Sequence, residues 1–300
     1  MNEKETRYMG LIRSRYPQIE VSEIEFNMND GRHNDVVIVN NTYVFKFARY
    51  DWGVVFLENE AKVTNFIRER ISVPMPAHEP LERDMVKYNI IKGKPVFRNT
   101  LLQMNGRTQE IMAEQIGGFL KKLHSIPVED AEKRAIGEYP YALHQDQLLN
   151  LFEDIQRKVF PYCTGYTREC IRQVFKPLED NHGFLAYKTA LIHGEFSPCH
   201  LFMDSDSKKL TGVIGFGLSG LGDPAYDIGV LLDNLGETFV KRVGRYYNNM
   251  QDLINRARFY AALNNILWMR DISDMITTRD FTRFRFDLRE RDIMPVGSNW

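Results

Sequence analysis

The sequence predicts an α+β fold in two lobes: a small N-terminal lobe of an antiparallel sheet plus helix, and a larger, mainly helical C-terminal lobe. Three observations support this prediction. Two β-rich runs early in the chain flank an Asn-Asn pair, an amphipathic helical stripe follows them, and helical periodicity dominates beyond Lys92-Gly93. We place the boundary there, with residues 1–91 as the first lobe and 92–300 as the second.

The elements of the first lobe follow from local patterns. The residues on both sides of Asn40-Asn41 are mostly β-branched or aromatic, which predicts an antiparallel hairpin with its turn at the Asn pair. The next stretch repeats apolar residues at helical spacing. We therefore predict strands over 21–26, 35–39, 42–47 and 85–91, and helices over 6–16 and 56–70.

The second lobe repeats apolar residues at helical spacing over most of its length. The predicted helices cover 112–123, 145–160, 167–178, 226–240 and 251–270. The segment 210–214 has the pattern of a short strand instead. Three hundred residues with 43% hydrophobic content are enough to build a sizeable core for this arrangement.

Composition argues against several classes of protein. A formal charge of −1 and the lack of any dense basic cluster make nucleic acid an unexpected partner. The charged first residues lead into no apolar signal core, and no apolar run is long enough for a membrane span. Cys163, Cys170 and Cys199 have neither disulfide nor zinc-ligand spacing. We expect a cytoplasmic protein that binds no membrane, and the sequence does not indicate its oligomeric state.

Lys46 and Glu60 are charged residues at positions where the pattern predicts burial. Lys46 interrupts an apolar strand, and Glu60 lies on the apolar stripe of the following helix. Burying either charge alone is costly, so pairing them solves both problems. The alternative is a lysine that extends to water and a glutamate at the edge of its stripe.

A second group of polar residues is His193-Gly194-Glu195, with His200 five positions after Glu195. This spacing matches a phosphoryl-transfer catalytic loop, in which an acid orients or deprotonates a hydroxyl and the later residue binds metal. The strand pattern of 210–214 follows at hairpin distance and ends at Gly215.

Together these segments resemble the aminoglycoside phosphotransferase family, and they look closest to the branch that modifies the 2″-hydroxyl. The segments that carry the resemblance are Tyr43–Phe47, Asn59-Glu60, Leu191–Pro198 with His200, Leu210–Ile214 with Phe216-Gly217, and Gly222–Pro224 with Asp227. They span most of the chain in the family's order.

The resemblance implies a bilobal protein-kinase-like fold with a nucleotide bound between the lobes, near Tyr88, Ile90 and Ile91. It also implies transfer of phosphate from ATP or GTP, with Mg²⁺, to a hydroxyl of an aminoglycoside antibiotic, which confers antibiotic resistance. In such enzymes the strand lysine, here Lys46, contacts the nucleotide phosphates while the helix glutamate, here Glu60, holds it in place.

The same resemblance places His193 and Glu195 in the catalytic loop and assigns the metal to His200 and position 215. The chain departs from the family twice, because Glu195 and Gly215 stand where aspartates are expected. Glutamate keeps the acid but adds a methylene, whereas glycine offers no oxygen ligand to magnesium. Two alternatives therefore stay open: an inactive pseudokinase or inactivated variant that binds nucleotide or aminoglycoside, and a kinase of another small molecule such as a macrolide or choline.

A run of acidic residues lies in the stretch 210–240, which contains no Lys or Arg. Its members are Asp223, Asp227, Asp233 and Glu237. Such a run could attract a cationic antibiotic and form part of its binding site. In the alternative, Asp223 and Asp227 hold the loop and the helix start, and the other two are solvated. Asp271 and Asp274, in the last helical stretch, are further candidates for contacts with amines.

Overall fold

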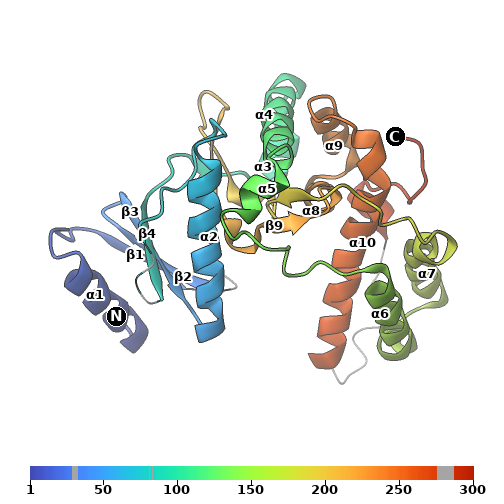
Figure 1. Cartoon of the computed structure of the whole chain (residues 1–300), viewed down its shortest axis with the longest axis horizontal. Helices are drawn as coiled ribbons and strands as arrows, with labels where there is room; N and C mark the ends of the chain where they lie inside the picture. Colours follow the sequence, from blue (N-terminus) through green and yellow to red (C-terminus); the bar gives the residue numbers. More distant parts are fainter. Residues whose placement is uncertain (29–32, 81, 83, 276–286) are drawn as a thin grey trace.

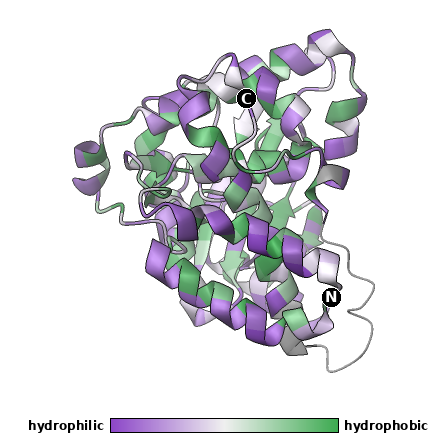
Figure 2. Ribbon diagram, turned by 90° about the vertical axis from the view of Figure 1, so that its right-hand side faces the viewer, coloured by the Kyte–Doolittle hydropathy of each residue, from purple (hydrophilic) through white to green (hydrophobic). Residues whose placement is uncertain are grey.

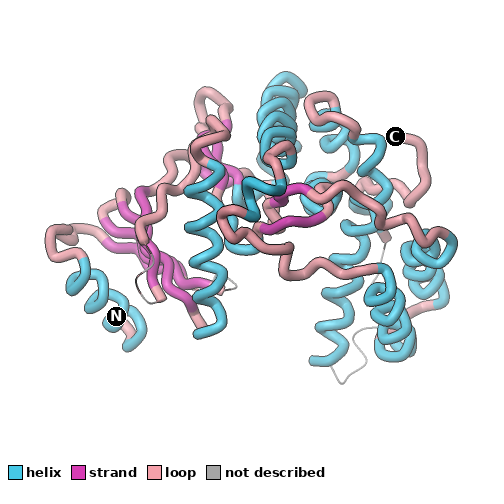
Figure 3. The backbone as a smooth tube through the Cα atoms, viewed as in Figure 1, coloured by secondary structure: helices cyan, strands magenta, loops and turns pink. Residues whose placement is uncertain are grey.

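A computed structural model has the predicted α+β architecture, with a small sheet-containing part followed by a larger helical part (Figure 1). The structure describes residues 1–28, 33–80, 82, 84–275 and 287–300, and the side chains of residues 271–275 and 289 lie outside that description. The long strands gather in the first part, and short strands join the helices of the second (Figure 3).

The N-terminal sheet is antiparallel, with its strands in chain order. The strands are β1 (Ile24–Asn27), β2 (Asn34–Val39), β3 (Tyr43–Ala48) and β4 (Met85–Asn89). In the β2–β3 hairpin Val37 pairs with Phe45. Asn40 and Asn41 have φ of 54° and 46°, a conformation that asparagine tolerates better than most residues. The predicted hairpin is confirmed, whereas β4 ends two residues before the predicted limit.

The two faces of this sheet are covered by different helices (Figure 1). Helix α1 (Glu3–Arg15) packs on the face that carries Phe45 and Phe47. Helix α2 (Val54–Ile67) packs on the other face through Leu57. Because side chains alternate along a strand, Lys46 points to the α2 side.

The second part is mainly helical, and its longest helix, α10, crosses the centre (Figure 1). Its helices are α3 (Arg98–Gln103), α4 (Gly106–His124), α5 (Val128–Glu132), α6 (Gln145–Lys158), α7 (Gly165–Asp180), α8 (Ala225–Leu235), α9 (Glu237–Gly244) and α10 (Met250–Met275). Apolar residues face inward and polar residues cover the outside of the helices (Figure 2). Within the described residues, every helix is too short or too polar to cross a membrane.

One predicted helix is divided in the structure. The stretch 226–240 forms all of α8 except its first residue and the start of α9, with Gly236 between them. Gly236 has a φ of 79°, which a right-handed helix cannot contain. The pattern of apolar residues continues across this break, so the prediction of a single helix was wrong.

Two small sheets position the loops of the site. One contains β5 (Lys94–Pro95), β7 (Leu201–Met203) and β8 (Leu210–Val213), and the other pairs β6 (Ala190–Ile192) with β9 (Gly220–Gly222). The loop from His193 to His200 joins β6 to β7. The segment with Gly215 follows β8, so the two loops lie side by side.

Candidate functional site

Lys46 and Glu60 form a buried ion pair between β3 and α2. The Lys46 Nζ lies 2.8 Å from each carboxylate oxygen of Glu60, and the two residues are 8% and 2% exposed. Burial opposes both charges, but each partner outweighs that effect: the pKa of Lys46 rises to about 12 and that of Glu60 falls to about 2. The pairing predicted from the sequence is therefore present in the structure.

Two further side chains surround this pair. The ring centroid of Tyr88 lies 6.0 Å from the Lys46 Nζ, and burial raises the pKa of Tyr88 to about 12. His78 Nε2 lies 3.8 Å from Glu60 Oε1, and burial lowers the pKa of His78 to about 4. The expected hinge residue Tyr88 is thus beside the expected phosphate-binding lysine.

The other two expected hinge residues connect the sheet to the second part. The Ile90 N–H donates to the Thr42 carbonyl at 2.8 Å. The Ile91 side chain lies against Gly212 of β8, where an added Cβ would be only 2.3 Å from it. Both side chains are half-buried, and their nucleotide contacts stay a prediction.

His193 is a fully buried support of the catalytic loop. Its Nδ1 accepts the Glu195 N–H at 3.2 Å, so the ring proton lies on Nε2, which donates to the Ile214 carbonyl at 2.9 Å. Burial lowers the pKa of His193 to about 4, which keeps the imidazole neutral. His193 therefore ties the loop of Glu195 to the segment that precedes Gly215.

Asp227 fixes the same loop from α8. Its carboxylate accepts the backbone N–H groups of His193 at 2.8 Å and Gly194 at 2.9 Å. His124 Nε2 lies 3.0 Å from the same carboxylate. Burial would raise the pKa of Asp227, but the hydrogen bond and charge of His124 and the other contacts lower it. Asp227 holds the loop, as the alternative interpretation of the acidic run predicted.

Two other members of the acidic run are also buried and paired. Asp223 is 4% exposed and accepts from Arg256 Nε at 2.7 Å, and Glu237 is 2% exposed and accepts from Arg258 Nε at 3.1 Å. The expectation that Asp223, Asp227 and Glu237 bind a cationic antibiotic is therefore wrong: arginines of α10 pair with Asp223 and Glu237, and backbone N–H groups and His124 bind Asp227. The alternative was also wrong in expecting Glu237 to be solvated.

The remaining acidic candidates are less enclosed or not described. Asp233 is half-buried, accepts from Asn265 Nδ2 at 2.8 Å and forms an ion pair with Arg291. Asp271 and Asp274 lie on the last turns of α10, and their side chains are outside the described residues. Any contact of Asp233, Asp271 or Asp274 with a substrate stays a prediction.

His200 and Gly215 face each other at the expected metal position. His200 Nδ1 donates to the Glu195 carbonyl at 2.8 Å. Gly215 has a φ of 86°, and a Cβ placed on it would lie 2.8 to 2.9 Å from three atoms of the His200 ring. No three His, Cys, Asp or Glu side chains converge as metal ligands anywhere in the described part of the chain. The residues present do not fit a magnesium site of the expected kind.

The charge of Glu195 acts on the ion pair and on two tyrosines. Glu195 is half-buried, and its charge contributes to the raised pKa of Lys46. Burial raises the pKa of Tyr139 and Tyr226, and the Glu195 charge adds to both increases. The charge of Glu195 therefore raises the pKa values of Lys46, Tyr139 and Tyr226 together.

Two residues, Asn59 and His124, have a role in the site that the sequence did not assign to them. Asn59 Nδ2 donates to the carbonyls of Gly217 at 3.0 Å and Ser219 at 2.8 Å, which links α2 to the segment after Gly215. No local spacing in the sequence indicates a role for His124, because its partner Asp227 is 103 residues away. The position of Asn59 beside Glu60 was the one available signal.

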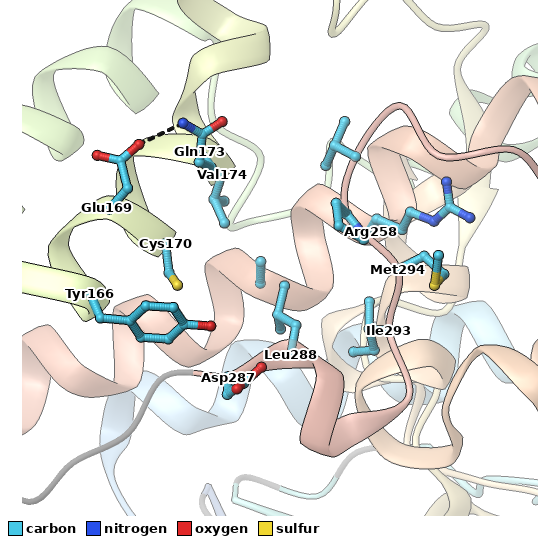
Figure 4. A pocket seen from close by; sticks show the side chains of 13 residues that line it. Tyr166, Glu169, Cys170, Gln173, Val174, Arg258, Asp287, Leu288, Ile293 and Met294 are labelled. Atoms are coloured by element: carbon cyan, nitrogen blue, oxygen red, sulfur yellow. Dashed lines mark hydrogen bonds between the residues drawn. The ribbon is translucent and has the colours of Figure 1, made fainter.

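A separate cavity of about 350 Å³ lies between α7, α10 and the C-terminal segment (Figure 4). Tyr166 and Cys170 from α7 face Leu288 across it (Figure 4). None of the sequence-predicted site residues lines this cavity, so it is distinct from the site at Glu195.

Comparison with known sequences gives partial matches. The chain is 28% identical over 130 residues to "Uncharacterized protein YcbJ" of Escherichia coli (strain K12), covering 43% of this chain and 39% of that protein. It is 27% identical over 184 residues to "Aminoglycoside 3'-phosphotransferase" of Escherichia coli, covering 58% of this chain and 62% of that protein. The match thus spans less than two thirds of either relative.

Comparison with solved structures matches nearly the whole fold. The GDP complex of wild-type aminoglycoside 2'-phosphotransferase-IIIa superimposes with a TM-score of 0.83 at 22% identity, covering 96% of this chain and 97% of that one. Macrolide 2'-phosphotransferase type I gives a TM-score of 0.67 at 17% identity, covering 94% and 95%. Residues 27–260, which include the Lys46–Glu60 pair and the loops of Glu195 and Gly215, match the phosphotransferase enzyme family. The chain therefore belongs to the phosphotransferase enzyme family.

Proposed function

We propose that this protein transfers the γ-phosphoryl group of ATP or GTP to a hydroxyl of a small-molecule antibiotic. The single observation that supports this most is the buried Lys46–Glu60 pair, whose electrostatic neighbours include Glu195. A kinase-type donor site needs a lysine fixed by a glutamate, and an acid within reach of the transferred group. The relatives named for aminoglycosides and macrolides give the first acceptors to test.

On the donor side, Lys46 would neutralise phosphate charge. A buried ammonium held by two hydrogen bonds is already oriented, so little reorganisation is needed when a nucleotide binds. Tyr88, Ile90 and Ile91 would contact the base, next to the strand that carries Lys46.

On the acceptor side, Glu195 would receive the hydroxyl proton. The acceptor oxygen forms a bond to the γ-phosphorus, the bond from that phosphorus to the bridging oxygen breaks, and the nucleoside diphosphate leaves. His193 and Asp227 hold the backbone of the Glu195 loop through three hydrogen bonds. Their task is positioning, which phosphoryl transfer depends on heavily.

A second candidate function is nucleotide binding without efficient transfer. The observation that favours it is Gly215, which supplies no carboxylate and lies against the His200 ring. The described residues at this position do not fit Mg²⁺. In this chain Lys46 would therefore neutralise phosphate charge without a metal ion held by a carboxylate at position 215. Slow turnover is the expected consequence.

Mass spectrometry of an acceptor panel incubated with ATP or GTP tests the proposal. The panel contains kanamycin, gentamicin, streptomycin and a macrolide, each with the native chain and with Glu195→Gln. The expected result is one added phosphate with the native chain and none with the variant. Nucleotide binding with no transfer to any acceptor would favour the second candidate.

A further inference from the structure

A tyrosine-lined cavity lies beside the catalytic loop. Its volume is about 60 Å³, and much of the rest of its lining is aliphatic. The tyrosines are Tyr139, Tyr141, Tyr187, Tyr226 and Tyr260. Tyr139 is 5% exposed and forms part of the floor, whereas Tyr141 and Tyr187 are 52% and 39% exposed and lie at the mouth. A cavity of this size has room for a small alkyl substituent and not for a whole ring, and the two exposed phenols extend its surface outward.

The cavity is next to the proposed catalytic acid. Ile192, three residues before Glu195, is part of its lining. The Tyr139 hydroxyl donates to the Gly194 carbonyl at 3.4 Å, and the rings of Tyr139 and Tyr226 are 4.8 Å apart. A molecule that occupies the cavity would therefore lie next to the loop that carries Glu195.

The described lining has no carboxylate free to bind an ammonium group. Asp223 is its one acidic residue. Its oxygens accept from Arg256 at 2.7 and 3.2 Å, from the Tyr260 hydroxyl at 3.2 Å and from the Ala225 N–H at 2.9 Å. A primary ammonium placed here would lose its hydration without gaining a charged partner.

We propose that the acceptor places an apolar substituent in this cavity, packs the adjoining apolar face against the exposed rings of Tyr141 and Tyr187, and bears at most one positive charge. Aromatic and aliphatic walls stabilise such a face by excluding water, and the faces of the tyrosine rings attract a single alkylated ammonium. A sugar rich in primary amines would bind more weakly, because each amine needs a carboxylate or water. This inference rests on the proposed phosphotransferase function and narrows its acceptor class.

Calorimetric titration of the full chain, without turnover, tests the inference. The probes are erythromycin, which has apolar rings and one tertiary amine, and kanamycin, which has several primary amines. We expect erythromycin to bind at least tenfold more tightly. Tyr141→Ser combined with Tyr187→Ser should weaken that binding about tenfold or more, whereas Tyr166→Ser, in the separate cavity of Figure 4, should leave it unchanged.

Three results would overturn the inference: kanamycin binds more tightly than erythromycin, erythromycin does not bind, or erythromycin binds equally well after Tyr141 and Tyr187 are replaced. A parallel titration with ADP and with GDP separates this failure from that of the proposed function. If either nucleotide binds the native chain and not the folded double variant Lys46→Met, Glu60→Leu, the donor site is intact whatever the acceptor result. If neither nucleotide binds the native chain, the phosphotransferase proposal itself is contradicted.

Discussion

The ring of His200 occupies the space next to Gly215 that a side chain at position 215 would need. A Cβ on Gly215 would come within 2.8 Å of that ring, and its φ of 86° already disfavours other residues. The two positions are therefore coupled: a carboxylate can return to 215 only if residue 200 gives way.

Gly215→Ala should lower the free energy of unfolding more than Gly297→Ala does. Gly297 has a φ of 89° but nothing within 4 Å of an added Cβ, so that variant reports backbone strain alone, about 1 to 2 kcal/mol. The excess at position 215 comes from His200 and should disappear in the His200→Ala background. Chemical denaturation measures the native chain, the three single variants and the Gly215→Ala, His200→Ala double variant, and equal costs at the two glycines would show that His200 is no obstacle.

Lys46→Met should destabilise the protein by roughly 3–5 kcal/mol, because it leaves Glu60 buried without its partner. Adding Glu60→Leu should recover much of that loss, since the unpaired carboxylate is then gone. Lys62→Met on the exposed side of α2 is the control and should change little. A double variant no more stable than Lys46→Met would argue against an interdependent pair.

Buried histidines predict a loss of stability in mildly acidic solution. The pKa values of His78 and His193 are about 4 in the folded chain, below the ordinary value of 6.5. Between those values the unfolded chain binds more protons, so the free energy of unfolding should fall as the pH drops from 6.5 towards 4. Each histidine contributes up to about 1.4 kcal/mol per pH unit. His78→Leu should halve the slope, and an unchanged slope would exclude this origin.

Asp227→Asn should slow phosphate transfer on the order of a hundredfold, because misplacing a catalytic group by 1 Å can have that effect. It should also speed hydrogen exchange at the amides of His193 and Gly194, which donate to Asp227. Asp252→Asn, an exposed position on α10, is the matched control. If both amides in Asp227→Asn exchange at the rates of the native chain, Asp227 does not support the loop.

The sequence predicts best what depends on neighbours along the chain. The β2–β3 hairpin and the Lys46–Glu60 pair could be predicted because a turn signal and the cost of burying a charge act locally. One interpretation of the acidic run gave Asp227 its role in holding the loop. The burial of Asp223 and Glu237 against Arg256 and Arg258 could not be predicted, because these arginines come from α10, 33 and 21 residues further along the chain. The tyrosine cavity likewise joins several distant segments, so no local pattern indicates it.

The most direct test of the central claim compares phosphate transfer by the native chain and by the combined variant Glu195→Asp, His200→Asn, Gly215→Asp, both with magnesium and ATP or GTP. If this is a phosphotransferase site limited by position 215, the variant should transfer phosphate at least about tenfold faster. Phosphate transfer by neither protein to any acceptor, or a native rate equal to that of the folded variant, would contradict the account.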